Sequence, residues 1–253
     1  MSFPALKNAK VFQPQSSYQS NPYAQEYSGN AGNYVAAKPM SFDSTITKSA
    51  IAFTILLAGA ALGWFIPGLM LPAVLAGLVL GLVISFKQVT NPAAILSYSG
   101  LQGVVIGGIS GVLEAMYPGI VTQAVLATLS VFVTILVLAK AKIFRTSPKL
   151  NRIFMVAALG YLLFGLVNLG LMLFGVTEGM FGLYSDLGGL GIIIGVLGVA
   201  LASYSLVGDF EYIEQGIENQ AEAKYEWFGV FGLIASLVWL YIEILRLLAI
   251  FRQ

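Results

Sequence analysis

The 253-residue chain contains no cysteine and no histidine, and only 10% of its residues are charged. Without cysteine there are no disulfide bonds, no thiolate nucleophile and no thiolate metal site. Without histidine there is no Ser-His catalytic triad, no imidazole metal ligand and no imidazole proton shuttle. Thirteen Lys and Arg residues against twelve Asp and Glu leave a net charge of +1. This balance argues against nucleic acid as a partner, because nucleic-acid binding usually needs a basic face.

Hydrophobic residues, by contrast, make up 58% of the chain, and the mean hydropathy is +0.84. A soluble domain carries about a quarter charged residues, so we expect most of this polypeptide to face hydrocarbon. Seven apolar segments approach or exceed the roughly 20 residues that a membrane-spanning helix needs. They cover approximately residues 46–66, 68–86, 93–115, 118–139, 153–175, 187–208 and 227–251. The predicted fold class is an all-α, polytopic membrane helix bundle with seven transmembrane helices. Six or eight helices are the alternatives, because the first two segments are nearly fused.

Residues 1–44 differ from the rest of the chain, since they are rich in Ser, Asn, Gln, Gly and Tyr and contain no apolar run. Such a segment buries too little apolar surface to offset the entropy of ordering, and it lacks the apolar core of a signal peptide. We therefore expect a disordered, polar cytoplasmic tail (1–44) followed by a seven-helix transmembrane domain (45–253). A weaker alternative makes the tyrosines of the tail a motif for a partner.

The basic residues are distributed unevenly between the two sides that seven spans would define. Eleven of the thirteen lie on the side of the N-terminus, whereas the loops near residues 67, 117 and 176–186 carry none. The eleven are Lys7, Lys10, Lys38, Lys48, Lys87, Lys140, Lys142, Arg145, Lys149, Arg152 and Lys224. The positive-inside rule then predicts the N-terminus inside and the C-terminus outside a cell membrane.

Small and amide side chains inside the spans favour helix packing over chemistry. Glycines recur every three or four positions in the third and sixth segments, a spacing that lets membrane helices approach closely. These glycines are Gly103, Gly107, Gly111, Gly191, Gly195 and Gly198. A phosphate-binding loop is the alternative for the last group, but no Walker lysine follows it. Gln102, Gln123 and Asn168 are interpreted as hydrogen-bonding links between helices.

Ionisable groups inside a membrane are costly and normally imply a partner or a water-filled path. Glu243 lies well inside the last span, and Asp209 closes the sixth. One interpretation pairs Glu243 with Arg246 one helical turn later. The other makes Glu243 and Asp209 a carboxylate pair that shares a proton or accepts a cation, because two nearby acids raise each other's proton affinity. The acids that follow Asp209 are expected to form a solvated face, namely Glu211, Glu214, Glu218, Glu222 and Glu226.

At these acids the sequence resembles the Bax inhibitor-1-like family of seven-span membrane proteins. The last helix of that family typically carries Leu-Tyr-x-acid-x-x-x-Leu, which matches Leu240-Tyr241-Ile242-Glu243 followed by Leu247. Its sixth helix typically ends in an aspartate, which Asp209 matches. Further likenesses are Gln123-Ala124 with Thr128 and Phe132 in the fourth span, and Leu101-Gln102-Gly103 in the third, where the family usually has Glu-Gly. The resemblance covers residues 45–253.

This resemblance implies a membrane protein that passes calcium passively and senses pH. Asp209 and Glu243 would form the proton sensor and the cation path, with Arg246 as a counter-charge that modulates them. Calcium would be a transported ion rather than a cofactor, and the partners would be the lipid bilayer, calcium ions or protons. The sequence departs from the family at Glu243, where an aspartate is usual, and at Gln102, where a glutamate is usual. Asp209 and Glu243 are also 34 positions apart, which is longer than usual in the family.

Two other functional classes remain as alternatives. The chain could be a non-conducting membrane protein that regulates stress responses or a membrane protease, using its glycine-rich faces and its tail to contact a membrane protein partner. A membrane enzyme is the least favoured class, because an aspartyl protease would need two facing aspartates. We therefore expect no catalytic residue, no cofactor and no resident metal.

Overall fold

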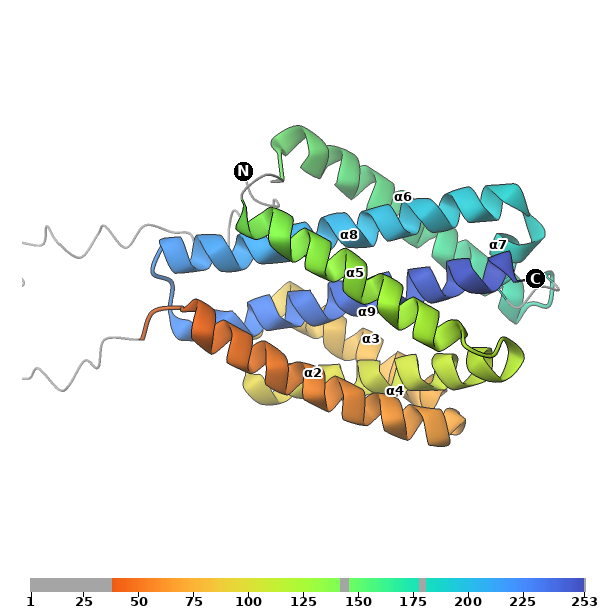
Figure 1. The fold of residues 1–253 in the computed structure, drawn as a ribbon, viewed down its shortest axis with the longest axis horizontal. Helices are drawn as coiled ribbons and strands as arrows, with labels where there is room; N and C mark the ends of the chain where they lie inside the picture. Colours follow the sequence, from red (N-terminus) through yellow and green to blue (C-terminus); the bar gives the residue numbers. More distant parts are fainter. Residues whose placement is uncertain (1–37, 142–145, 178–180, 253) are drawn as a thin grey trace, which may run out of the picture.

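The computed structural model describes residues 38–141, 146–177 and 181–252. Within these ranges the chain folds into long helices (Figure 1) and forms only one isolated β-bridge. The long helices are α2 (Phe42–Phe65), α3 (Met70–Lys87), α4 (Pro92–Met116), α5 (Ile120–Lys140), α6 (Pro148–Leu173), α8 (Gly189–Glu218) and α9 (Glu226–Phe251). Short helical segments are η2 (Pro67–Leu69), α7 (Leu183–Asp186) and η3 (Ala223–Tyr225).

The prediction of seven membrane-spanning helices is confirmed, because the described residues contain seven helices long and apolar enough to cross a membrane. The sixth of them, α8, does not end near residue 208 as expected but continues to Glu218. Its 30 residues extend over about 45 Å, whereas the hydrocarbon core of a bilayer is about 30 Å thick. The last turns of α8 therefore project beyond the apolar layer. The short helix α7, between α6 and α8, was not predicted.

Helix starts follow local sequence signals. Ser41, Asn91 and Ser147 each accept a hydrogen bond from a backbone N–H in the first turn of α2, α4 and α6, respectively. A proline follows immediately at the start of α4 and of α6, where the missing N–H needs no partner. These caps satisfy N–H groups that have no acceptor within the helix.

Successive long helices run in opposite directions, so the bundle has two ends (Figure 1). One end, which we call the basic end, carries the start of α2, the connections around residues 88–91 and 219–225, the end of α5 and the start of α6. The opposite end carries the connections around residues 66–69 and 117–119, the end of α6, the start of α8 and the end of α9. The first and last described residues consequently lie at different ends of the bundle.

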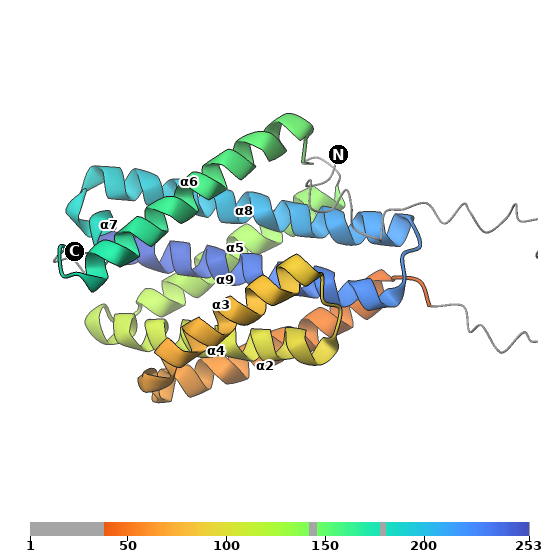
Figure 2. The same cartoon turned by 180° about the vertical axis from the view of Figure 1, so that it is seen from behind.

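Helix α9 lies at the centre of the molecule, and α6 lies at its edge. In the apolar stretch of the span that contains α9, 56% of the residues are buried. In the corresponding stretch of α6, only 6% are buried. Side chains of α9 take part in three separate core clusters, with α2 and α4, with α4 and α5, and with α5 and α8. Figure 2 shows α3 against α4 and α6 across α8, on the side away from α5. Thus α9 joins a unit of α2, α3 and α4 to a unit of α5, α6 and α8.

Part of the predicted tail is structured. Residues 1–37 lie outside the described residues, but residues 38–41 contact the connection between α8 and α9, and α2 begins at Phe42. Met40 is 4% exposed. Within the described residues, helix α2 thus begins before the boundary between residues 44 and 45 that composition suggested.

Candidate functional site

Asp209 lies on α8 and faces α9 through hydroxyl groups. The Ser236 hydroxyl donates a hydrogen bond to its Oδ2 atom, and Ser236 also bonds the hydroxyl of Ser205 at 2.9 Å. Gly232 makes room for the carboxylate, because a Cβ atom at that position would lie 2.4 Å from Asp209 Oδ1. No Lys or Arg within the described ranges forms an ion pair with Asp209. The structure therefore surrounds this acid with small and hydroxyl-bearing residues.

Glu243 has a different environment, dominated by a cation. It is 3% exposed and forms an ion pair with Arg246 on the same helix. The indole Nε1 of Trp239 donates to Glu243 Oε1 at 3.1 Å. Arg246 also donates to the hydroxyl of Tyr161 on α6, and its guanidinium lies 3.7 Å from the ring centroid of Tyr184. The first interpretation, a neutralising pair between Glu243 and Arg246, describes this arrangement.

The structure does not bring Asp209 and Glu243 into direct contact. Ser236, the α9 partner of Asp209, precedes Glu243 by seven residues, or about 10 Å along the helix. On α8, Gly198 approaches Glu243 so closely that a Cβ atom would lie 2.5 Å from Oε2. Gly198 precedes Asp209 by eleven residues, or about 16 Å. The two carboxylates occupy different levels of the α8–α9 interface, and each has its own hydrogen-bond partners.

An apolar groove of about 960 Å³ separates α2 from α5. Its floor is α9, with contributions from α4 and from Phe210 and Ile213 of α8. Among its few polar atoms, the hydroxyls of Ser110 and Tyr241 bond each other at 2.7 Å. The buried hydroxyl of Ser49 also lies in the lining and has no hydrogen-bond partner in the part of the chain that is described. Asp209 does not line the groove but immediately precedes Phe210, which does.

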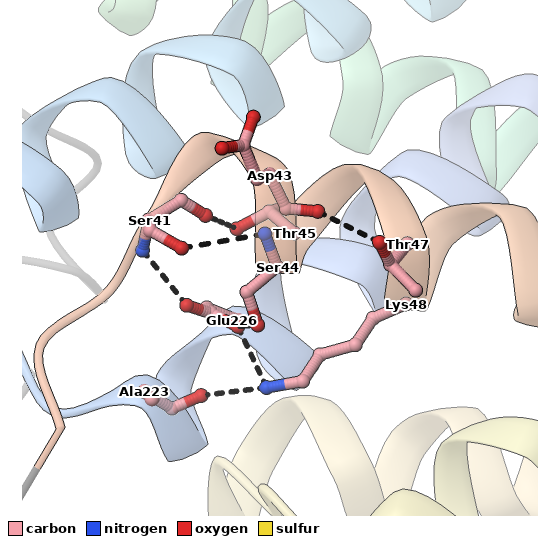
Figure 3. Close-up of polar contacts among 8 residues, drawn as sticks. All are labelled: Ser41, Asp43, Ser44, Thr45, Thr47, Lys48, Ala223 and Glu226. Atoms are coloured by element: carbon pink, nitrogen blue, oxygen red, sulfur yellow. Dashed lines mark hydrogen bonds and ion pairs between the residues drawn. The ribbon is translucent and has the colours of Figure 1, made fainter.

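A second buried acid, Glu226, was missed by the sequence analysis. It was expected on a solvated face, and this prediction is wrong, because Glu226 is 0% exposed at the first turn of α9. Its carboxylate accepts hydrogen bonds from Ser41 N at 2.8 Å, Ser44 Oγ at 2.6 Å and Lys48 Nζ at 2.6 Å. Figure 3 shows these residues gathered around Glu226. The Lys48 ammonium also donates to the carbonyl of Ala223 at 3.1 Å. Lys48 inside the first apolar segment was the available signal for such a pair.

Two further acids bind backbone groups. Glu211 accepts hydrogen bonds from the backbone and the hydroxyl of Thr146. Glu114 accepts from Gly119 N at 2.6 Å and Val121 N at 3.0 Å, so it caps the start of α5. Within the described ranges, no three acidic residues gather closely enough to hold a metal ion.

Two of the three amides, Asn168 and Gln123, and the glycines of α4 take part in contacts between helices. Asn168 of α6 accepts from Leu183 N at 2.7 Å and donates to the carbonyl of Phe181, which fixes the approach to α7. Arg252 donates to Gln123 at 2.9 Å near the opposite end. A Cβ atom on Gly103 would lie 2.1 Å from the carbonyl oxygen of Leu56, so α4 and α2 touch through their backbones.

Comparison with known families decides the assignment that these motifs suggested. The family model described as Bax inhibitor 1 like matches residues 4–253, nearly the whole chain. The chain belongs to this family. No curated protein is similar enough to be matched. With its seven apolar helices, this Bax inhibitor 1 like chain is a multi-pass membrane protein whose environment is a lipid bilayer.

Proposed function

We propose that this Bax inhibitor 1 like protein is a pH-sensitive calcium leak that uses no covalent chemistry. One observation carries the proposal: Asp209 lies in an apolar bundle beside two serine hydroxyls and forms no ion pair among the described residues. A calcium ion prefers carboxylate and neutral oxygen ligands, which Asp209, Ser205 and Ser236 can supply. Only the deprotonated carboxylate attracts a cation, so flux increases with pH as Asp209 loses its proton.

In the same proposal, Glu243 and Arg246 form a second site that the cation passes. Because Arg246 neutralises Glu243, a cation reaching this level replaces the guanidinium as the partner of the carboxylate. Arg246 is thus a counter-charge that regulates the availability of Glu243. The two acids act in succession along α8 and α9 rather than as one proton-sharing pair.

The orientation in the membrane completes the proposal. The basic end of the bundle, with Lys87, Lys140 and Lys149, faces the cytoplasm according to the positive-inside rule. The N-terminus is then inside and the C-terminus outside the cell membrane. Calcium entering from outside meets Glu243 first and Asp209 afterwards.

Flux into liposomes that contain a calcium dye tests this function. We expect the wild-type protein to admit calcium at a rate that increases with pH, and Asp209→Asn and Glu243→Gln to lose most of that flux. Asp186→Asn is the matched control, because Asp186 is exposed on α7 and lies in neither cluster. Wild-type flux in both Asp209→Asn and Glu243→Gln would contradict the proposal.

The apolar lining of the groove favours the second candidate, a non-conducting regulator that acts through contacts with another membrane protein. Deleting residues 1–36 separates the two functions while leaving the structured residues 38–41 in place. A conducting bundle keeps its flux after the deletion. A regulator shows no flux in either form and loses a co-purifying partner when the tail is removed.

A further inference from the structure

The segment just before and within the first turns of α2 is fastened to the connection between α8 and α9. We call residues 38–48 the strap. The carbonyl of Lys38 accepts from Ala223 N at 2.8 Å, and Met40 N donates to Ala221 O at 2.7 Å. Pro39 pairs with Glu222 in an antiparallel β-bridge. Met40 also packs on Gly216, where a Cβ atom would lie 2.6 Å from the methionine sulfur.

Glu226 locks this contact, and all three of its hydrogen-bond donors come from the strap. They are Ser41 N, Ser44 Oγ and Lys48 Nζ (Figure 3). The carboxylate is completely buried, so moving the strap away would leave it without donors in a desolvated position. Lys48 additionally lies 5.4 Å from the ring centroid of Trp227. Moving the strap away would therefore break these contacts of Glu226 and Trp227 together.

The second half of α2 is held by different contacts. Cβ atoms on Gly59 and Gly63 would lie 2.3 Å and 2.1 Å from the carbonyl oxygens of Gly100 and Val104 on α4. Two backbones in such contact form a rigid unit that does not depend on the strap. Both halves of α2 line the groove, and the first half does so through residues that include Thr45 and Ser49. Undocking therefore leaves α2 anchored at its far half and free at the basic end.

We propose that the strap is an autoinhibitory contact: docked, it closes the basic end of the groove between α2 and α5, and undocked, it lets α2 swing outward and admit water. The lining of the groove is apolar, so in this proposal water reaches the neighbourhood of Phe210 and Asp209 only after the movement of α2. The inference rests on the docking geometry. It is tested without ion flux, so its failure and that of the proposed leak are distinguishable.

A single cysteine at position 49 reports the movement, because the chain has no cysteine of its own. Ser49→Cys is nearly isosteric, and the Ser49 hydroxyl has no hydrogen-bond partner to lose among the described residues. The variant is placed in lipid nanodiscs, where both membrane faces are open, and labelled with a water-soluble maleimide. We expect slow labelling with the strap intact. Adding Glu226→Gln or Lys48→Met should increase the rate about tenfold, as a minor open state becomes a major one.

Glu222→Gln is the matched control. Glu222 is a neighbouring glutamate in an exposed ion pair with Lys224, and its carboxylate does not bind the side chains of the strap. A rate for Glu222→Gln equal to that of Ser49→Cys alone supports the proposal. An unchanged rate in both Glu226→Gln and Lys48→Met would overturn it.

A disulfide bond that holds the strap in its docked position distinguishes two explanations of fast labelling, undocking of the strap and general loosening of the bundle. Pro39→Cys with Glu222→Cys places two cysteines at a β-bridge pair, where Cα atoms are about 4.5–5.5 Å apart, within disulfide range. In the Glu226→Gln background, oxidation of this pair should return labelling at position 49 to the slow rate. A fast rate that survives oxidation would show that the bundle itself has loosened, and would overturn the proposal.

Discussion

At the residue scale, the two acids predicted for the candidate site differ in the groups that stabilise their negative charge. Glu243 has Arg246 one turn away, whereas Asp209 has only the hydroxyl of Ser236 as a charge-stabilising side chain in the contacts described. Because the chain has no histidine, a pH response must come from carboxyl groups. Asp209 can change its protonation without breaking an ion pair, and the proposed leak therefore has Asp209 as the source of its pH response.

The ion pair predicts a non-additive mutational effect. Arg246→Met leaves the buried Glu243 carboxylate without its counter-charge, and breaking such a pair costs about 3–5 kcal/mol of unfolding free energy. The double variant Glu243→Gln with Arg246→Met removes both charges and should recover most of this loss. Unfolding in mixed detergent micelles measures the difference. Additive losses in the double variant would contradict the pairing.

The sequence predicted the position of the intramembrane acids but not their relation. Glu243 stood out because it interrupts an apolar run, and Asp209 because it closes one. Whether they meet depends on how far α8 slides along α9, and this is determined by close contacts such as Gly198 with Glu243 and Gly232 with Asp209. Glu226 was misjudged for a related reason, since its partners Ser41, Ser44 and Lys48 come from a segment about 180 residues away in sequence.

At the scale of elements, the long apolar runs were sufficient to predict the membrane helices, because in lipid every backbone polar group must be bonded within the helix. Polar residues after Asp209 obscured the continuation of α8 to Glu218. Tertiary contacts hold these turns, including those of Glu211 with Thr146 and of Gly216 with Met40. The glycine spacing in α4 correctly predicted a close helix contact, although only the structure identifies α2 as the partner.

The α2–α4 contact predicts a position-specific effect of one added methyl group. Gly103→Ala would place Cβ 2.1 Å from the carbonyl oxygen of Leu56, and a backbone atom cannot move aside cheaply. We expect a loss of about 1–3 kcal/mol in unfolding free energy. Gly160→Ala on α6 meets nothing within 4 Å and should be neutral or slightly stabilising. Thermal unfolding of the two variants in the same detergent measures the contrast, and equal melting temperatures would contradict it.

At the scale of the whole molecule, seven antiparallel passes place the described N- and C-terminal residues at opposite ends of the bundle. The basic end and the opposite end differ sharply in charge, and this difference led to the proposed orientation. The groove between α2 and α5, with α9 as its floor, separates the two helical units.

Orientation is tested with reporters at the two ends of the chain. A reporter that is active only in the cytoplasm should be active before Met1 and inactive after Gln253. One that is active only outside should show the reverse pattern. Removing positive charge is a suitable control. Replacing Lys140 and Lys149 together weakens the difference in positive charge between the two ends of the bundle, and should lower the fraction of protein in the proposed orientation. A C-terminal reporter active in the cytoplasm would reverse the proposed orientation.

The pH profile of calcium flux through liposome-reconstituted protein tests the central claim most directly. Wild-type flux should increase with pH, because the deprotonated Asp209 carboxylate attracts the cation and the protonated form does not. Asp209→Asn keeps the shape of the side chain and an oxygen for Ser236, so its flux should be low and independent of pH. An Asp209→Asn protein whose flux followed the wild-type pH profile would contradict the account.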